Sequence, residues 1–457
     1  MKEMQLLYQY VDDHQEEFLE ELFPLLRKKS ISYTATVEEM TECAQLLLDI
    51  LKKHDFKAKI FSSPGFPYVY GERIYAKNAP TVLIYGHYDV MPVEPVDAWN
   101  TAPFEPTIID GKLFCRGASD DKGQSMTYLL GYETYKTLFG HVPVNVKFIF
   151  DGEEEIGSPN LPDFVATHTE LLKADFLLSS DSKIHESGRP VLFLGLKGMC
   201  SVDLIVRGGT KDLHSMYAPV APSPVWRLIT LLSSLKGEDG IVKLDHFYDD
   251  VAPLTDLDYD AISKIPFDAD TVKKNLDISH FVKNRTGEDY YYNYIYEPTC
   301  NIGFISAGYA DGVKDVIPHE ATARLDLNLV PHQKPETVLQ LLRQHLDRRG
   351  YTDVEIIPCS MMTPYRSPLN SDCLPLLCDA VREVWEKDPV ILPGIGGFGP
   401  NISFCEHLGI PNIYIPYGAL DNSNHAPNES LVVDGYLKGI KVFATILNKL
   451  TQKTAVL

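Results

Sequence analysis

The sequence has no uninterrupted apolar run of about 18 residues, the length that a transmembrane helix needs. Its first segment, MKEMQLLYQYVDDHQEEFLEELF, has neither the basic start nor the apolar core of a secretory signal peptide. The eight cysteines are scattered and form no C-x-x-C pair, so reduced and mostly buried thiols are expected. These absences predict a cytoplasmic protein that neither spans nor binds a membrane.

Basic residues are also scarce. The chain carries 42 Lys and Arg against 63 Asp and Glu, a formal net charge of −21. A nucleic-acid-binding protein needs basic patches that neutralise phosphate, so this charge argues against such a partner. Acidity of this size mostly serves solubility, and carboxylates around a metal ion would account for only a few of the charges.

The length of 457 residues exceeds what one compact core usually holds, and two domains are expected. A hydrophobic fraction of 44% and a charged fraction of 23% are typical of a globular protein. No internal repeat and no low-complexity tract interrupts the chain.

The first part of the chain alternates helical and strand patterns. Alternation of this kind predicts an α/β domain with a mostly parallel sheet. The expected elements are one long amphipathic helix around residues 6–23, a helix over Val37–His54, a helix from about Gln124, and strands at Lys57–Phe61, Thr81–Val90, Val144–Phe150 and Ala174–Ser180.

The pattern then changes to that of a smaller α+β domain, before the α/β pattern resumes. We expect a first domain formed by residues 1–195 and 363–457 and an inserted domain at 196–362. Within the insertion, residues 236–298 are acidic and rich in tyrosine, including YYYNYIY at Tyr290–Tyr296. Ordinary packing is the favoured interpretation of this aromatic run, and a partner surface is the alternative.

The strand at Thr81–Val90, TVLIYGHYDV, ends in a histidine and an aspartate. Ligands bind beyond the carboxyl ends of strands in open α/β sheets, which is where His87 and Asp89 fall. Side chains alternate along a strand, so these two lie on the same side. His87 could bind a metal while a carboxylate holds its other ring nitrogen. A purely structural His–Asp pair is the alternative.

Other acidic and histidine residues follow predicted strands in the same way. Taken singly, each fits a polar loop, and the glutamate triplet fits a solvated charge run. Together they indicate one site with a mixed oxygen and nitrogen shell, which suits Zn²⁺ and tolerates Mn²⁺ or Co²⁺. The number of carboxylates indicates two ions that share an attacking hydroxide, with a non-ligand glutamate as base. The residues are Asp120, Asp121, Glu153, Glu154, Glu155, Asp181 and His425.

Six motifs, in this order, resemble those of the M20 metallopeptidases, in particular the dipeptidase branch with carnosinases and PepV-like enzymes. They are GHYDVMPVE, FEPTIIDGKLFCRGASDDKGQ, FDGEEEIGS, the aspartate of SSDS, DLHS and NHAPNE. The resemblance covers nearly the whole chain. It implies a discontinuous zinc-peptidase catalytic domain with a mixed, mostly parallel sheet, and an inserted ferredoxin-like α+β domain that serves as lid and dimerisation domain.

The resemblance also implies roles for individual residues. His87 is similar to the ligand of one zinc, with Asp89 as its partner, and Asp120 to the carboxylate that bridges both metals. The peptide bond between Asp120 and Asp121 is cis in relatives, and a cis bond is therefore expected here. The motif E-E-x-G-S makes Glu154 the general base and Glu155 a ligand. The remaining ligands are Asp181 and His425, and Glu153 is interpreted as structural.

His214, in KDLHS, resembles the lid histidine that polarises the scissile carbonyl. That task needs an N–H donor aimed at the developing oxyanion. Without the resemblance, a single histidine in this region would be interpreted as a surface residue. In similar M20 dimers each lid sends its histidine into the partner's site, so a homodimer is expected.

Two positions depart from the dipeptidase pattern. Relatives that hold a free C-terminal carboxylate commonly carry Arg in a lid strand reading R-L-V-P, where this sequence has Asn328. Arg324 lies four residues earlier on the same face, at a distance that puts its substitution for that Arg in doubt. The later loop, often G-G-S, reads Gly396-Gly397-Phe398. Asn328 and Gly397 are the candidate substrate-binding residues.

The sequence thus predicts a two-zinc hydrolase that cleaves an amide bond of dipeptides or short peptides with a Glu-activated bridging water. An aminoacylase or other deacylase acting on N-acyl amino acids is the alternative within enzymes. A catalytically silent binding protein that keeps the fold is the alternative outside them. The altered anchoring positions affect the expected substrate and leave the reaction unchanged.

Overall fold

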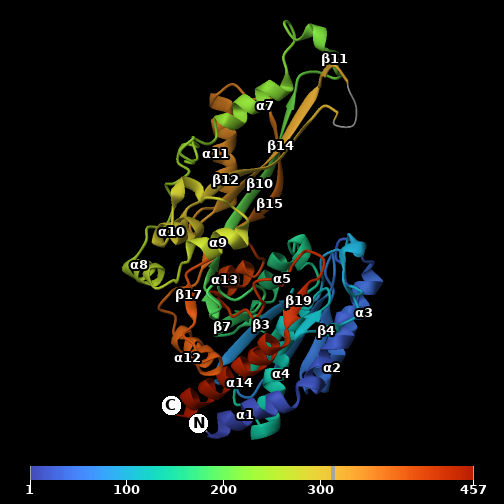
Figure 1. The fold of residues 1–457 in the computed structure, drawn as a ribbon, viewed down its shortest axis with the longest axis vertical. Coiled ribbons are helices and arrows are strands. Elements are labelled where there is room, and N and C mark those ends of the chain that lie inside the picture. Colours follow the sequence, from blue (N-terminus) through green and yellow to red (C-terminus); the bar gives the residue numbers. More distant parts are fainter. Residues whose placement is uncertain (1, 310–313, 456–457) are drawn as a thin grey trace.

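The computed structural model describes residues 2–309 and 314–455. The chain forms a larger body that contains both termini and a narrower body that projects from it and ends near β11 (Figure 1). Each body is built around its own sheet, of eight and four strands respectively. The prediction of a mixed α/β fold is confirmed. Within the described residues, no helix is long and apolar enough to cross a lipid bilayer.

The large sheet combines strands from both ends of the chain. Its order is β1-β2-β6-β3-β7-β18-β8-β17, and the neighbours β6, β3, β7 and β18 run parallel. β1, β2 and β6 are joined by antiparallel pairing, β18 is antiparallel to β8, and β17 is parallel to β8. The strands are β1 Lys57–Phe61, β2 Tyr68–Arg73, β3 Thr81–His87, β6 Asn145–Asp151, β7 Phe176–Ser179, β8 Val191–Phe193, β17 Val390–Leu392 and β18 Asn412–Tyr414.

Helices cover both faces of this sheet, so its central strands are apolar on both sides. In β3, Val82 and Ile84 belong to the main core, whereas Leu83 and Tyr85 belong to the core of the opposite face. A strand that is buried on both faces has a continuous apolar sequence, and this pattern is why β3 could be predicted from the sequence. The main core holds α1 Lys2–Asp13, α2 Gln15–Leu26, α3 Val37–Lys53, α4 Lys122–Phe139, α12 Leu374–Trp385 and α14 Val433–Ala455, and the other face holds α5 Leu161–Thr167, α6 Thr169–Leu172 and α13 Ile402–Leu408.

The expectation of one long helix around residues 6–23 is wrong. Two helices, α1 and α2, meet at His14, whose φ of −109° and ψ of 21° leave the helical region. His14 Nδ1 lies 2.8 Å from the carbonyl oxygen of Tyr10, and the two rings stack. The apolar spacing continues across this break, so periodicity alone could not reveal it.

The projecting body has a four-stranded antiparallel sheet in the order β12-β14-β10-β15. Its strands are β10 Gly198–Arg207, β12 Thr299–Ala307, β14 Glu320–Leu329 and β15 Glu355–Met362, and its helices are α7 Pro224–Ser233 and α11 Pro335–Arg348. Along the chain these elements follow the order βαββαβ of a ferredoxin-like unit. Burial alternates along β14, so one face of the sheet packs on the two helices.

Other short strands form small sheets that are separate from the two main ones. β9 Gly195–Leu196 pairs with β16 Tyr365–Arg366 where the chain enters and leaves the projecting body. β11 Leu213–His214 pairs with β13 Val316–Ile317, and β4 Thr107–Ile109, β5 Lys112–Phe114 and β19 Ser430–Val432 form a small sheet. The predicted boundary after residue 195 falls within β9, and the one after residue 362 lies shortly before β16; both boundaries stay predictions.

The tyrosine-rich segment folds into three short helices, α8 Asp256–Ser263, α9 Ala269–Leu276 and α10 Glu288–Tyr296. Tyr291, Ile295 and Tyr296 of α10 are buried in a cluster with Val191 and Val390 of the large sheet. Packing therefore accounts for the buried part of the aromatic run.

Candidate metal centre and active site

Parallel strands bring the candidate site residues to one edge of the large sheet. His87 is the last residue of β3 and pairs in register with Asp151, the last residue of β6. Glu154 follows β6 in a short 3₁₀ turn, Glu154–Ile156, and Asp181 follows β7. Because β6, β3 and β7 are parallel neighbours, the segments that follow them meet at their carboxyl ends.

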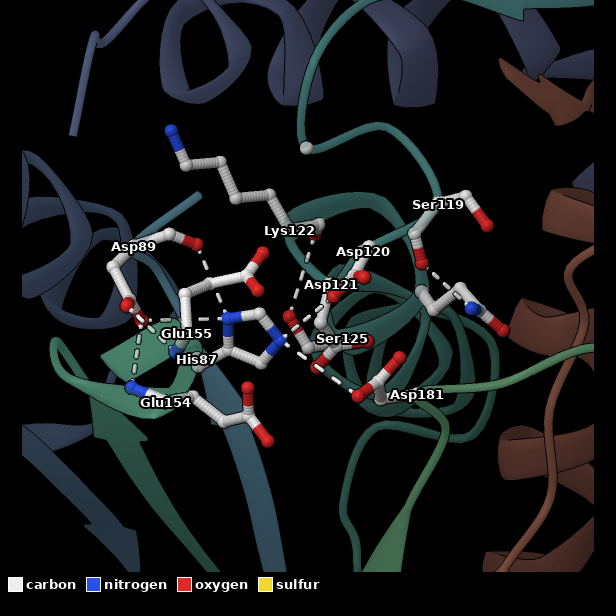
Figure 2. A network of polar contacts seen from close by, with 12 residues as sticks. His87, Asp89, Ser119, Asp120, Asp121, Lys122, Ser125, Glu154, Glu155 and Asp181 are labelled. Carbon is white, nitrogen blue, oxygen red and sulfur yellow. Dashed lines mark hydrogen bonds and ion pairs between the residues drawn. The ribbon is translucent and has the colours of Figure 1, made fainter. Parts of the chain in front are cut away.

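Asp89 holds both the histidine and the glutamate turn (Figure 2). His87 Nδ1 lies 3.1 Å from the carbonyl oxygen of Asp89 and 3.4 Å from its Oδ1. The backbone N–H groups of Glu154 and Glu155 donate to Asp89 Oδ1 and Oδ2, at 3.1 and 3.0 Å. An Nδ1–H on His87 therefore donates to Asp89, which leaves Nε2 for a metal.

Two groups of potential metal ligands share one carboxylate. His87, Asp120 and Asp181 form one group, Asp120, Glu155 and His425 form the other, and within each group the ligand atoms lie within 4.8 Å of one another. Asp120 Oδ1 is 3.0 Å from His87 Nε2, and Asp120 Oδ2 is 3.0 Å from His425 Nε2. The two oxygens of Asp120 thus face different groups, as a carboxylate that bridges two cations would.

The residues of the two groups fit a cation site. His87 Nε2 is buried and has no hydrogen-bond partner among the described residues, although it lies near Asp120. Burial, and then the charge of Asp120, raise the pKa of Asp181 to about 8 and that of Glu155 to about 7. Crowded, buried carboxylates and an unpaired imidazole nitrogen are stabilised by bound cations, and carboxylate–imidazole shells suit Zn²⁺.

Glu154 belongs to neither ligand group. Its side chain lines a cavity of about 250 Å³ together with Asp120, Asp181 and His425. Burial raises the pKa of Glu154 well above its usual range. Glu153, by contrast, is buried away from both groups and accepts a hydrogen bond from Asn160 Nδ2 at 2.8 Å. The geometry therefore places one carboxylate of the triplet in a candidate ligand group, one in the cavity outside both groups, and one in a hydrogen bond with Asn160.

A buried ion pair that the sequence did not suggest holds the loop that carries Asp120. Arg116 donates to Glu429 Oε2 at 2.8 Å, and both side chains are almost fully buried. Glu429 Oε2 also accepts from the N–H of Gly117, and Oε1 from those of Ser119 and Asp120, at 2.8 to 3.0 Å. Glu429 lies four residues after His425 in NHAPNE, which was the only signal for it in the sequence.

Gln124, at the start of α4, ties three loops of the site together. Its amide nitrogen, Nε2, donates to the carbonyl oxygens of Ser119 and Ser182, at 2.7 and 2.9 Å. Its Oε1 accepts from the N–H groups of Tyr417 and Gly418, at 2.6 and 3.0 Å. This buried amide thereby links the Asp120 loop, the Asp181 loop and the segment after β18.

The peptide bond between Asp120 and Asp121 is cis, as expected.

The other predicted site residues lie outside the cavity. His214 is exposed at the end of β11, and β11 lies at the far tip of the projecting body (Figure 1). Asn328 lies on β14 between Met199 of β10 and Thr299 of β12. The carbonyl oxygen of Gly397 accepts a hydrogen bond from the N–H of Lys197 at 3.0 Å. The roles of these three residues stay predictions.

Arg324, the residue considered as a substitute for the missing arginine, and Phe398, the second departure from the dipeptidase pattern, have different surroundings. Arg324 donates to both carboxylate oxygens of Asp203, at 2.8 and 2.9 Å. This bidentate pair engages its guanidinium on the sheet of the projecting body. Phe398, in contrast, lines the cavity beside Glu154 and His425.

Comparison with known proteins agrees with this geometry. The sequence profile of peptidase family M20/M25/M40 matches residues 83–449. The chain belongs to this family. Over 98% of its length the chain is 27% identical to Beta-Ala-His dipeptidase of Rattus norvegicus, covering 96% of that protein. It is 28% identical to Cys-Gly metallodipeptidase dug1 of Schizosaccharomyces pombe, over 97% of this chain and 98% of that one.

A solved M20 structure is similar over nearly the whole chain. It is the M20 family metallo-carboxypeptidase Sso-CP2 from Sulfolobus solfataricus, with a TM-score of 0.89 and 36% identity over 95% of this chain and 99% of that one. The prediction of an M20-type metallopeptidase of the dipeptidase branch is confirmed.

Proposed function

We propose that this M20 peptidase is a dipeptidase that works with two Zn²⁺ ions, which Mn²⁺ or Co²⁺ can replace. The observation that carries the proposal is the shared carboxylate, Asp120, between two groups of ligands, with Glu154 beside them. His87 and Asp181 would hold one ion, and Glu155 and His425 the other. The dipeptidase names of the rat and fission-yeast relatives support a dipeptide substrate.

When bound, such a pair of cations supplies Lewis-acid activation of the attacking water and of the scissile carbonyl. Glu154 accepts the proton of that water and delivers it to the leaving amine. Asp89 orients His87 through Nδ1 and fixes the backbone from which Glu154 projects. Glu429 and Arg116 keep the Asp120 loop in place, so that the two carboxylate oxygens of Asp120 face the two ligand groups.

We also propose that His214 serves the active site of a second subunit. Within one chain, β11 lies at the far tip of the projecting body, and none of the described residues that line the cavity comes from that tip. An N–H donor has to approach the developing oxyanion to about 3 Å. A homodimer formed through the projecting bodies would bring His214 into the partner's cavity.

The surface of the projecting body supports an association of this kind. Among the residues that the structure describes, β12 is an edge strand paired only with β14, and its residues 301–307 are all exposed. Ile302, Phe304 and Ile305 are the large apolar side chains among them. Exposed edge strands with apolar side chains favour pairing with another chain.

A hydrolysis screen tests the proposal. Dipeptides and N-acetyl amino acids are incubated with protein that is chelated, then reloaded with Zn²⁺, Mn²⁺ or Co²⁺. Dipeptide hydrolysis that disappears on chelation and returns with metal supports the proposal. Preferential hydrolysis of the N-acetyl amino acids would favour the deacylase, which gains no support from the relatives named above. No hydrolysis with metal bound would favour a silent binding protein.

A further inference from the structure

The lining of the cavity beside the ligand groups has two unlike parts. One part consists of the residues assigned to the metals and the base, Asp120, Glu154, Asp181 and His425. The other part, here called the apolar wall, consists of Phe193, Leu196, Ile395 and Phe398, of which the first three belong to one apolar cluster. A substrate held with its scissile bond at the metals would therefore place one of its side chains against this apolar wall.

The described lining of the cavity offers no additional charged group that could pair with a charged side chain of the substrate. None of the described residues that line it is Lys or Arg, and its carboxylates and its histidine are those assigned to the metals and the base. Its other polar residues are neutral, and several bond to one another: Asn401 Nδ2 donates to Ser179 Oγ at 3.0 Å, and the Tyr414 hydroxyl donates to Asn401 Oδ1. Burying a charge without a partner is costly, whereas burying apolar area is favourable.

The loop that carries the apolar wall is fixed from two directions. The ring of Tyr294, in α10, lies directly on Gly396: a Cβ added there would come within 2.8 Å of Tyr294 Cε2. On the other side, the N–H of Ile395 donates to the carbonyl oxygen of Gly195 at 3.1 Å. The tyrosine-rich insertion thus supports the wall two residues from Phe398.

We propose that this wall is a side-chain subsite that selects a neutral, apolar side chain next to the scissile bond. Phe398 is its specificity-determining residue, and Tyr294 is a positioning residue that acts through Gly396. This proposal rests on the proposed dipeptidase function and names its substrate class. It also assigns a role to the tyrosine-rich insertion.

Six dipeptides test the subsite: Ala-Leu, Ala-Asp, Ala-Lys, Leu-Ala, Asp-Ala and Lys-Ala. With the metal-loaded enzyme, kcat/KM at one of the two positions should be at least about tenfold higher for Leu than for Asp and Lys. Phe398→Arg should lower kcat/KM for Leu and raise it for Asp at that position, so that the Leu-to-Asp ratio falls by at least about tenfold. Phe398→Ser, which keeps the wall neutral, should lower the Leu preference without favouring Asp.

Tyr33→Arg is the matched control. Tyr33 is an aromatic residue that is 57% exposed and lies outside the cavity, so this variant should keep the wild-type ratios. Tyr294→Ala should raise KM for the preferred Leu dipeptide more than it lowers kcat. Tyr294→Phe, which keeps the ring on Gly396 and loses only the hydroxyl, should restore most of the affinity.

The outcomes distinguish a failure of the subsite proposal from a failure of the proposed dipeptidase function. Metal-dependent hydrolysis with equal rates for Leu, Asp and Lys at both positions would overturn the subsite and leave the dipeptidase function standing. Ratios that stay unchanged in both Phe398 variants would overturn it as well. If no dipeptide is hydrolysed by metal-loaded enzyme, the proposed function itself has failed.

Discussion

At the residue scale, the three neighbouring carboxylates of Glu153, Glu154 and Glu155 have three different surroundings. Glu155 lies in a ligand group, Glu154 faces the cavity, and Glu153 binds Asn160. Asp89 sets this separation because it accepts hydrogen bonds from the backbone of both Glu154 and Glu155. Backbone anchoring of this kind gives each carboxylate a fixed direction.

Glu154→Gln should reduce kcat by several orders of magnitude and leave the metal content unchanged, because we propose Glu154 as the base and not as a ligand. Glu153→Gln is the matched control, and its folded fraction should keep most of the wild-type kcat. Steady-state kinetics and elemental analysis of both variants check this. Loss of metal from Glu154→Gln would show that the roles within the triplet are wrongly assigned.

Glu429→Gln should lower the free energy of unfolding by about 3 kcal/mol, because Arg116 then keeps a buried charge without its charged partner. The metal affinity should fall about tenfold or more, since the Asp120 loop loses part of its support. Glu105→Gln, which breaks the exposed pair between Arg27 and Glu105, is the control and should change the free energy of unfolding far less than Glu429→Gln does. Similar losses in the two variants would contradict the role given to Glu429.

At the element scale, one histidine joins three helices of the large body. His54 directly follows α3. Its Nε2 lies 2.5 Å from Oε1 of Glu21 in α2, and its Nδ1 lies 3.2 Å from Oε2 of Glu133 in α4. Burial lowers the pKa of His54, but hydrogen bonds to Glu133 and Glu21 outweigh it and raise the pKa to about 9. The folded protein therefore holds this proton more tightly than the unfolded chain does.

This shift predicts a stability that depends on pH. The contribution of protonated His54 is fully present below its unfolded pKa of about 6.5 and is lost as the pH rises through about 9. Between these values the wild type should lose roughly 2–3 kcal/mol more of its unfolding free energy than His54→Gln does. Denaturant unfolding at pH 6.5 and 9 measures the difference, and equal losses in the two proteins would contradict the assignment.

The elements that carry the site were predictable from the sequence because local signals specify them. β3 is a buried apolar run, and the site residues follow strands in motifs with a fixed order. The contacts of Glu429 with the Asp120 loop and of Gln124 with Tyr417 span about 300 residues, and no local pattern indicates them. β2, with Gly71 and charged residues in its second half, gave too weak an apolar signal to be predicted.

At the scale of the whole molecule, the proposed role of His214 in a second subunit would make a single chain an incomplete enzyme. The cavity has its candidate ligands and its base, whereas His214 lies at the far tip of the projecting body (Figure 1). A dimer that exchanges these tips would complete both sites. Activity should then depend on the association of two subunits.

Subunit complementation tests this dependence. His214→Ala and Glu154→Ala should each be nearly inactive, but in a heterodimer one site receives an intact His214 and keeps its own Glu154. Dissociating and reassociating a mixture of the two variants should therefore recover a substantial part of the wild-type activity. If subunit exchange is verified and the activity stays at the level of the single variants, His214 acts within its own chain or has no catalytic role.

Hydrolysis should require two cations that are joined through Asp120. The most direct test is to titrate metal-free protein with Zn²⁺ while bound metal and dipeptide hydrolysis are measured in the same samples. We expect two ions per chain, full activity only when both are bound, and weakened binding of both in Asp120→Ala. Full activity with a single ion per chain, or in protein shown to be metal-free, would contradict this requirement.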